Sequence, residues 1–159
     1  MLNDSELAEL EDVARRCRRD IVRMTHKAGS GHPGGSLSAI DALVVLYLRH
    51  MRVRPQEPLW HGRDMFFLSK GHCTPAYYAV MAARGYFPHE ELLTFRAMGS
   101  RLQGHPSNTH LPGVDSSSGS LGQGLSIANG AALAARYEGL NARYYVMIGD
   151  GESQEGQIW

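Results

Sequence analysis

The chain has 159 residues, enough for one domain with a buried core. Sixteen basic and sixteen acidic side chains give a net charge of zero, which leaves no overall field to attract nucleic acid or an anionic membrane. Two cysteines are too few for a disulfide framework, and neither a signal peptide nor a membrane-spanning apolar run is visible. We therefore expect a cytoplasmic protein whose partners are small molecules or other proteins.

Helical periodicity dominates the first fifty residues. Apolar side chains recur at steps of three and four over residues 7–24, which predicts an amphipathic helix ending before Gly29. A second apolar stripe over residues 37–47 predicts another helix. The short apolar run Met65–Leu68 is bounded by charged residues and glycine, a pattern typical of a buried strand.

Helix boundary signals follow this strand. Thr74 is expected to cap a helix that begins at Pro75 and stops at Gly85, because proline favours the first helical position and glycine the position after the last. A further short helix is predicted over residues 88–98. Residues 99–124 are rich in Gly, Ser, Pro and Asn, which indicates a long loop of the kind that is usually functional.

The last third of the chain returns to regular structure. An alanine-rich helix is predicted over residues 125–137, ending near Gly139, and the run 144–148 predicts a buried strand. Strands that alternate with helices favour an α/β fold, a parallel sheet flanked by helices.

A carboxylate between two glycines follows the last predicted strand, in the run Gly149-Asp150-Gly151-Glu152. Parallel sheets place ligands at the carboxyl ends of their strands. The Asp150 carboxylate offers the hard oxygen ligand that Mg²⁺ prefers, and the glycines allow close approach of an anion. The run therefore predicts a site for a divalent cation that carries phosphate.

Three histidines directly follow glycine: His32, His72 and His105. Imidazole can donate to phosphate or hydroxyl oxygens and exchanges protons near pH 7, which suits a phosphorylated, polyhydroxylated substrate or cofactor. Two alternatives stay open, namely three turn histidines satisfied by local hydrogen bonds, or a zinc site, although the spacing lacks the paired-ligand pattern of zinc. The glycine-rich run 119–124 opens the following helix and can cradle an anion or a flat ring, but a flexible turn would have the same pattern.

Five motifs occur in this order along the chain: Ser30-Gly31-His32-Pro33-Gly34-Gly35, Ser69-Lys70-Gly71-His72, Gln103-Gly104-His105-Pro106, Gly119-Ser120-Leu121-Gly122-Gln123-Gly124, and Gly149-Asp150-Gly151-Glu152 followed by Gln154-Glu155-Gly156. Together they resemble the transketolase family. The resemblance covers the amino-terminal part of the domain that, in this family, binds the diphosphate of thiamine diphosphate. Five ordered motifs are far more specific than any one of them.

The resemblance implies the cofactor contacts. Asp150 would be the Mg²⁺ ligand, Gly151 would contact the diphosphate of thiamine diphosphate through its backbone, and Glu152 would belong to the same cofactor-binding loop. His72 would reach the diphosphate, with a catalytic as well as a cofactor-binding role. The segment lying along the thiamine would consist of Gly119, Ser120 and Leu121.

The resemblance also implies the reaction, transfer of a two-carbon ketol unit from a ketose phosphate to an aldose phosphate, as in the pentose phosphate pathway. His32 and His105 would contact the sugar hydroxyls and assist proton transfer. Glu155 matches an acidic residue near the subunit interface of a dimer.

The resemblance further implies missing parts. The family's essential glutamate lies in a separate pyrimidine-binding domain, and a second Mg²⁺ ligand, an asparagine, follows the next strand. Both would lie beyond Trp159. We therefore expect residues 1–159 to form a partial diphosphate-binding domain, incomplete at its C-terminus, with the pyrimidine-binding and C-terminal domains absent. Such a chain would be inactive without a complementary pyrimidine-binding domain or subunit.

Two competing functions remain. The chain could belong to another thiamine diphosphate enzyme such as deoxyxylulose phosphate synthase, although the motifs Ser69–His72 and Gly119–Gly124 favour transketolase. Alternatively, it could be a non-catalytic interaction module that keeps the dimer surface. The module hypothesis predicts association with a complementary chain that survives Asp150→Ala and removal of Mg²⁺.

Overall fold

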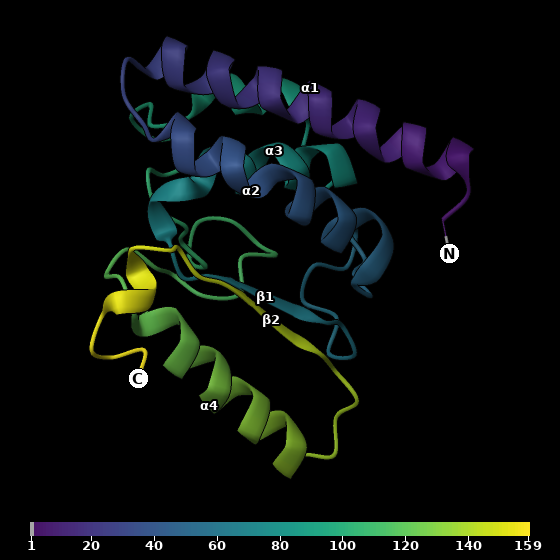
Figure 1. Cartoon of the computed structure of the whole chain (residues 1–159), viewed down its shortest axis with the longest axis vertical. Helices are drawn as coiled ribbons and strands as arrows, with labels where there is room; N and C mark the ends of the chain where they lie inside the picture. The colour runs from purple at the N-terminus through teal and green to yellow at the C-terminus, as the bar shows by residue number, and fades with distance from the viewer. Residues whose placement is uncertain (1) are drawn as a thin grey trace. The chain divides into compact units, whose positions relative to one another are not determined.

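The computed structural model describes residues 2–159, which divide into two compact units. The first unit comprises the chain up to His50 together with Cys73–Gly104. The second comprises Met51–His72 together with His105–Trp159. Figure 1 labels the helices and strands of both.

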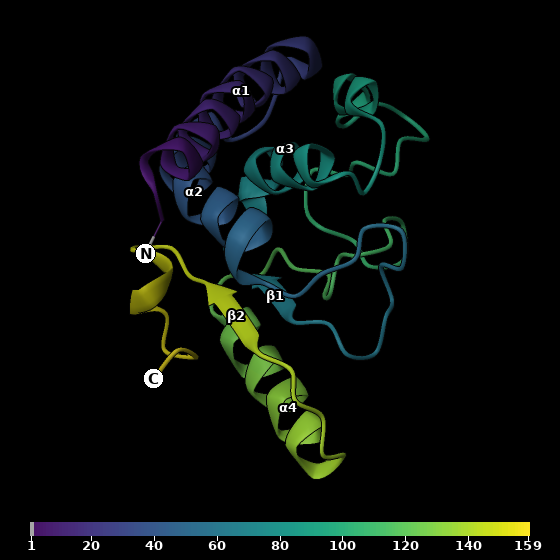
Figure 2. The ribbon, with the colours of Figure 1, turned by 90° about the vertical axis from the view of Figure 1, so that its right-hand side faces the viewer.

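The first unit is built from α1 (Asp4–Ala28), α2 (Pro33–Val45) and α3 (Thr74–Arg84), which contact one another pairwise (Figure 2). A π-helical turn, Leu46–His50, continues α2. The apolar stripes predicted from the sequence form the core between these helices, because burying one face of each amphipathic helix removes apolar area from water. Fully buried side chains in this core include Ile21, Met24, Ile40, Leu43, Tyr47, Tyr77 and Tyr78.

Local signals set both ends of α1, of which the sequence predicted the glycine stop. Asn3 and Glu6 form a capping box at its start, in which each side chain accepts a hydrogen bond from the other residue's backbone N–H. Gly29 ends the helix in the left-handed conformation, at φ 62°.

The predicted cap of α3 is wrong, although its glycine stop is confirmed. Thr74 is the first residue of the helix and Cys73 precedes it as the cap residue. The Thr74 hydroxyl donates instead to the carbonyl oxygen of Gly104, at 3.0 Å. Gly85 ends α3 at φ 95°. The Thr74 hydroxyl, which the local pattern assigned to capping the helix, therefore forms a tertiary hydrogen bond instead.

The helix predicted over residues 88–98 is shorter than expected. Only the 3₁₀-helix His89–Thr94 forms, and the chain then turns at Arg96, whose φ is 60°. Leu92 and Phe95 are buried in the first unit. Two anchoring side chains are sufficient for a short turn, whereas an α-helix of eleven residues would need a longer apolar stripe.

The second unit contains a two-stranded parallel sheet and one helix. Strand β1 (Met65–Leu68) pairs with β2 (Tyr144–Met147), with Met65 opposite Tyr144 and Leu68 opposite Met147. Helix α4 (Gln123–Tyr137) contacts both strands and runs beside β2 in Figures 1 and 2. The predicted strands, the parallel sheet and the helix before β2 are therefore confirmed.

Burial differs between the two strands. β1 is buried at three of its four positions, as predicted, whereas all four residues of β2 are only partly buried. Among residues 2–159, β2 pairs with a single strand, so one of its edges remains open. The expectation of a buried strand at residues 144–148 is thus wrong for the described part of the chain.

Candidate functional site

The second unit contains three of the five sequence motifs whole, together with His105 and Pro106 of a fourth, around the carboxyl ends of β1 and β2. Ser69 directly follows β1, and its N–H donates to the carbonyl oxygen of Met147, at 3.0 Å. Gly149 follows β2, with the Lys70 side chain about 3.6 Å from the position that a Cβ on this glycine would occupy. The loops that carry His72 and Asp150 therefore start side by side.

Glu152 is the central polar residue of this arrangement. Its carboxylate is buried, with 3% of the residue exposed. One oxygen, Oε1, accepts from the Ser69 hydroxyl at 2.5 Å and from the N–H of Gly122 at 2.9 Å. The other, Oε2, accepts from the N–H of Gly149 at 2.9 Å. One side chain thus joins the end of β1, the glycine-rich run before α4 and the end of β2.

Ser69 makes the second link between these segments. Its hydroxyl oxygen accepts a hydrogen bond from the N–H of Gly124, at 3.2 Å, while donating to Glu152. The approach is so close that a Cβ at Gly124 would lie 2.5 Å from Ser69 Oγ. Gly122 adopts a left-handed conformation, with φ 81°. These two glycines are required by the fold of the loop.

The loop that carries His72 packs against the segment before α4. Ser118 donates from its hydroxyl to the carbonyl oxygen of Leu68, at 2.7 Å. A Cβ at Gly71 would lie 2.6 Å from Ser118 Oγ and 2.9 Å from the backbone nitrogen of Gly119. His72 follows in a short 3₁₀-helix, Gly71–Cys73, and is partly exposed. The structure therefore brings the turn that carries His72 against the predicted thiamine segment.

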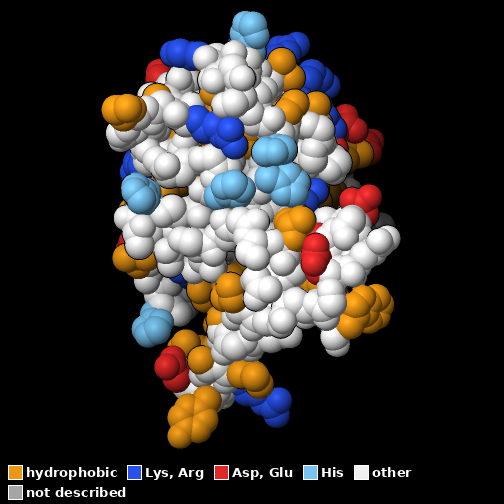
Figure 3. Space-filling model, turned by 90° about the vertical axis from the view of Figure 1, so that its left-hand side faces the viewer, with side chains coloured by type: hydrophobic (Ala, Val, Ile, Leu, Met, Phe, Trp, Pro, Cys, Tyr) orange, Lys and Arg blue, Asp and Glu red, His pale blue; other side chains and the backbone are white. Residues whose placement is uncertain are grey.

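The His105 ring lies against the same segment. The Cβ position of Gly119 is 3.4 Å from His105 Cδ2, within van der Waals contact. His105 is exposed. Figure 3, in which histidine side chains are pale blue, shows that several histidines of the chain lie at the surface. Gly119, Ser120 and Leu121 themselves are exposed or partly exposed.

A hollow of about 370 Å³ lies over this segment. Its walls combine serine hydroxyls, glycine backbone and one apolar side chain from α4. The lining residues are Ser117, Ser118, Gly119, Ser120, Gln123, Gly124 and Ile127.

Asp115 holds the long loop against β1. Its carboxylate accepts from the N–H of Phe66, at 2.6 Å, and forms an ion pair with Arg63. Burial raises the pKa of the Asp115 carboxyl above its ordinary value, while the Arg63 guanidinium opposes this rise. The predicted loop at residues 99–124 is thus confirmed as irregular up to Gly122, because α4 begins at Gln123, two residues earlier than predicted. Asp115 fixes the position of the loop by a buried charged contact.

Asp150 lies at the carboxyl end of β2, as the sequence predicted. Its side chain is exposed, and within the described residues its carboxylate forms no hydrogen bond or ion pair. The N–H of Gly151 likewise donates to no group within residues 2–159, and a Cβ on Gly151 would meet nothing within 4 Å. A hard oxygen ligand and a backbone donor therefore face open space, which fits a divalent cation that carries a diphosphate.

His32 belongs to the first unit, where it precedes α2 as its cap residue. It is exposed, and its carbonyl oxygen accepts from the Ser36 hydroxyl at 2.9 Å. Gly31 before it has φ 134°, and a Cβ there would lie 2.8 Å from Cγ2 of Thr25. The glycine before His32 is thus required for this turn, as the motif suggested.

Sequence reasoning missed the contributions of Ser69 and Ser118. Both hydroxyls bond to segments that are distant along the chain, so no local pattern identifies their partners. The position of Ser69 directly after an apolar strand was the available signal.

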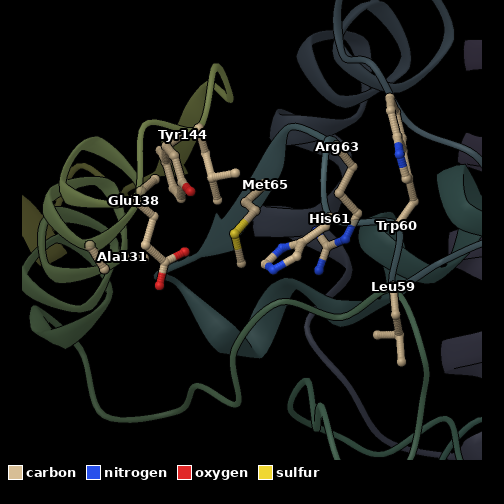
Figure 4. Close-up of a pocket in the computed structure, with 11 residues that line it drawn as sticks. Leu59, Trp60, His61, Arg63, Met65, Ala131, Glu138 and Tyr144 are labelled. Atoms are coloured by element: carbon tan, nitrogen blue, oxygen red, sulfur yellow. The ribbon is translucent and has the colours of Figure 1, made fainter.

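A second hollow, of about 290 Å³, lies at the opposite ends of the strands (Figure 4). Met65 and Tyr144, the first residues of β1 and β2, line it together with Glu138 and His61. None of the motif residues contributes to its walls. Across residues 2–159, no group of three or more His, Cys, Asp or Glu side chains is placed to share a metal ion.

The second unit thus combines a parallel strand pair with glycine-rich loops and an open carboxylate at the carboxyl ends of the strands, where α/β domains bind their ligands. Comparison with known proteins specifies the family. Residues 10–158 match the family model described as "Transketolase, thiamine diphosphate binding domain". The chain belongs to the transketolase family, in the part that binds thiamine diphosphate.

Individual relatives agree with this assignment. The chain is 46% identical over 151 residues to the 6-deoxy-6-sulfo-D-fructose transketolase subunit SqwG of Clostridium sp. (strain MSTE9), covering 95% of this chain and 55% of that protein. It is 40% identical over 158 residues to human transketolase, covering 99% of this chain and 25% of that protein. The crystal structure of Campylobacter jejuni transketolase superposes with a TM-score of 0.86 at 36% identity, over 92% of this chain and 24% of that one.

The chain therefore spans about half the length of the subunit relatives and about a quarter of the full-length transketolases it matches. The comparisons support the predicted family and a partial, amino-terminal segment of it. Separately, none of the described helices is both long enough and apolar enough to cross a membrane.

Proposed function

We propose that this chain forms the diphosphate-binding part of an enzyme that transfers a two-carbon ketol unit between sugar phosphates, with thiamine diphosphate and Mg²⁺ as cofactors. The observation that carries the proposal is the link through Glu152, which joins the Asp150 loop to the run Gly119–Gly124. The predicted metal ligand and the predicted thiamine segment belong to one unit and share a buried anchor.

The protein's own groups would bind and orient the cofactor. Asp150 would hold Mg²⁺ through its exposed carboxylate, and the N–H of Gly151 would donate to the diphosphate. His72 would donate to the same anion. Bound thiamine diphosphate would supply the electron sink that cleavage beside a carbonyl requires.

Two histidines would act on the sugar. His105 lies against Gly119, so its imidazole would stand beside the thiamine and could move a proton at the reacting carbon or its hydroxyl. The same role for His32 rests on the sequence motif alone. These groups bind and shuttle protons but cannot replace the glutamate that the family supplies from a pyrimidine-binding domain.

A complementary domain or subunit would complete the active site. Two relatives, from Phocaeicola vulgatus and Actinobacillus succinogenes, are each named as one subunit of an apulose-4-phosphate transketolase, so family members occur as separate chains. We propose the same kind of partner here, in a dimeric assembly with Glu155 near the interface. A cytoplasmic location and a place in the pentose phosphate pathway remain predictions from the sequence.

Cofactor titration tests the proposal. Thiamine diphosphate would be titrated into the protein produced from its own gene, with any partner chain that co-purifies, in the presence of Mg²⁺ or of a chelator. We expect saturable binding that requires Mg²⁺ and that Asp150→Ala abolishes. Glu138→Ala, an exposed carboxylate at the opposite ends of the strands, should bind normally.

The proposal would be overturned if thiamine diphosphate bound equally well to Asp150→Ala and to the wild type in the presence of the chelator. Assembly with a complementary chain that persists in the same variant, without any cofactor binding by the wild type, would favour the non-catalytic module. Consumption of pyruvate rather than a ketose phosphate by the loaded protein would favour a deoxyxylulose phosphate synthase activity.

A further inference from the structure

We infer that Glu152 is a positioning residue, whose buried carboxylate sets the spacing between the metal loop and the thiamine segment before any cofactor binds. The inference rests on the proposed function and deepens it. It assigns to Glu152 a role through other residues, in place of the cofactor-binding role that the family resemblance implied.

The first support is the direction of the side chain. Asp150 and Glu152 are two residues apart in one loop, yet Asp150 is exposed and Glu152 is buried. The Glu152 carboxylate accepts three hydrogen bonds, all from groups of the protein itself. A buried carboxylate with both oxygens held by internal donors would have to give up these hydrogen bonds to bind a metal ion.

The second support is the set of donors. Two of the three are backbone N–H groups of glycines, Gly122 and Gly149, in the two loops that the proposed function assigns to the cofactor. The third, the Ser69 hydroxyl, comes from the end of β1 and also accepts from Gly124. A carboxylate that accepts hydrogen bonds from three segments constrains all of them at once.

The third support is the cost of the alternative. Without Glu152, the N–H groups of Gly122 and Gly149 and the hydroxyl of Ser69 would lose an acceptor in a buried place, where unsatisfied donors are costly. The loops would then separate to reach water. Asp150 would no longer stand at a fixed distance from Gly119. Cofactor binding would then have to order the two loops, which lowers the affinity.

Glu152→Gln provides the main test, because it keeps the side-chain size but can accept at only one of the two oxygen positions. An amide N–H₂ would face either Gly149 or the pair Ser69 and Gly122. We expect thiamine diphosphate, titrated with Mg²⁺, to bind about tenfold more weakly. Gln154→Ala, an exposed change in the same turn, should leave the affinity unchanged.

Amide exchange of the cofactor-free protein provides a readout that ordinary destabilisation would not reproduce. Exchange at Gly122 and Gly149 should accelerate selectively in Glu152→Gln, while the core of the first unit keeps its protection. Ser69→Ala offers a second variant should Glu152→Gln fold poorly, since it removes one donor to Glu152 and the acceptor of the Gly124 N–H but leaves both backbone bonds to Glu152. The double variant should bind no more weakly than Glu152→Gln, because both changes act on one cluster.

Unchanged affinity in Glu152→Gln and Ser69→Ala would overturn this inference while leaving the proposed function intact. Equal weakening by Gln154→Ala would overturn it as well, because any change in the turn would then suffice. Failure of the wild-type protein to bind thiamine diphosphate would instead overturn the proposed function, and this inference with it.

Discussion

The imidazole ring of His105 lies over Gly119, with 3.4 Å between His105 Cδ2 and the Cβ position of the glycine. This contact lies within the long loop and joins its early part, at His105, to the segment that would lie along the thiamine. It places an imidazole, which can donate or accept a proton, beside the proposed reaction centre.

His105→Ala should therefore affect catalysis more than cofactor binding. We expect kcat for ketol transfer, measured on the assembled enzyme, to fall by about 10²–10⁴, the usual effect of losing a general acid or base. The dissociation constant of thiamine diphosphate should change far less. His110→Ala is the matched control, since His110 is exposed in the same loop and bonds only to local hydroxyls. Equal losses in both variants would contradict the assignment.

Two glycines of α4 should respond oppositely to alanine. A Cβ on Gly124 would lie 2.5 Å from Ser69 Oγ and 2.7 Å from Ser69 Cα, so Gly124→Ala should destabilise by roughly 1–3 kcal/mol. A Cβ on Gly130 would meet nothing within 4 Å, so Gly130→Ala should stabilise by about 0.5–1 kcal/mol through helix propensity. Urea unfolding of each variant measures the difference. Destabilisation by Gly130→Ala would show that its helix face is covered.

Asp64 anchors the chain just before β1. Its carboxylate, 1% exposed, accepts from the Arg52 guanidinium at 2.8 Å and from the N–H groups of Arg52 and Arg143 at 2.9 Å. Burial alone would raise the pKa of Asp64, but these hydrogen bonds bring it below its ordinary value. We expect Asp64→Asn to lose about 1–3 kcal/mol of stability at pH 7.

The same contact predicts a pH dependence. Because the folded-state pKa of Asp64 is lowered, its stabilisation is complete above the unfolded-state pKa of about 3.9 and is lost as the pH falls through the lower folded value. The difference in unfolding free energy between the wild type and Asp64→Asn should thus shrink below about pH 4. Denaturant unfolding between neutral and acidic pH measures it. A constant difference would show that the ionised carboxylate adds nothing.

Both cysteines should be inert in the native state. Cys17 and Cys73 are buried, and burial raises the pKa of the Cys17 thiol to about 12, which suppresses the reactive thiolate. A thiol reagent at about pH 8, close to the ordinary thiol pKa, should label neither residue until denaturant is added. Rapid native labelling of Cys17 would show that α1 opens locally.

Sequence patterns predicted most of the secondary structure because the relevant interactions are local. The apolar spacing over residues 7–24 is a repeat of one helical turn, and Gly29 acts on the last turn of the helix. The helix and its glycine stop both appear as expected. The predicted cap at Thr74 was wrong because the Thr74 hydroxyl donates to the carbonyl oxygen of Gly104, thirty residues away. The predicted burial of β2 was wrong because burial depends on neighbouring strands rather than on the strand's own residues.

The candidate site, too, was predictable from the sequence only in part. The sequence by itself determined that Asp150 follows a strand between two glycines and that His72, His105 and the run 119–124 carry the family's motifs. Only the tertiary structure decided that Asp150 faces solvent while Glu152 turns inward to Ser69, a residue 83 positions earlier in the chain. The physical reason is that the two carboxylates have similar chemistry and neighbouring positions, so their roles depend on which donors the packed loops bring within hydrogen-bond distance.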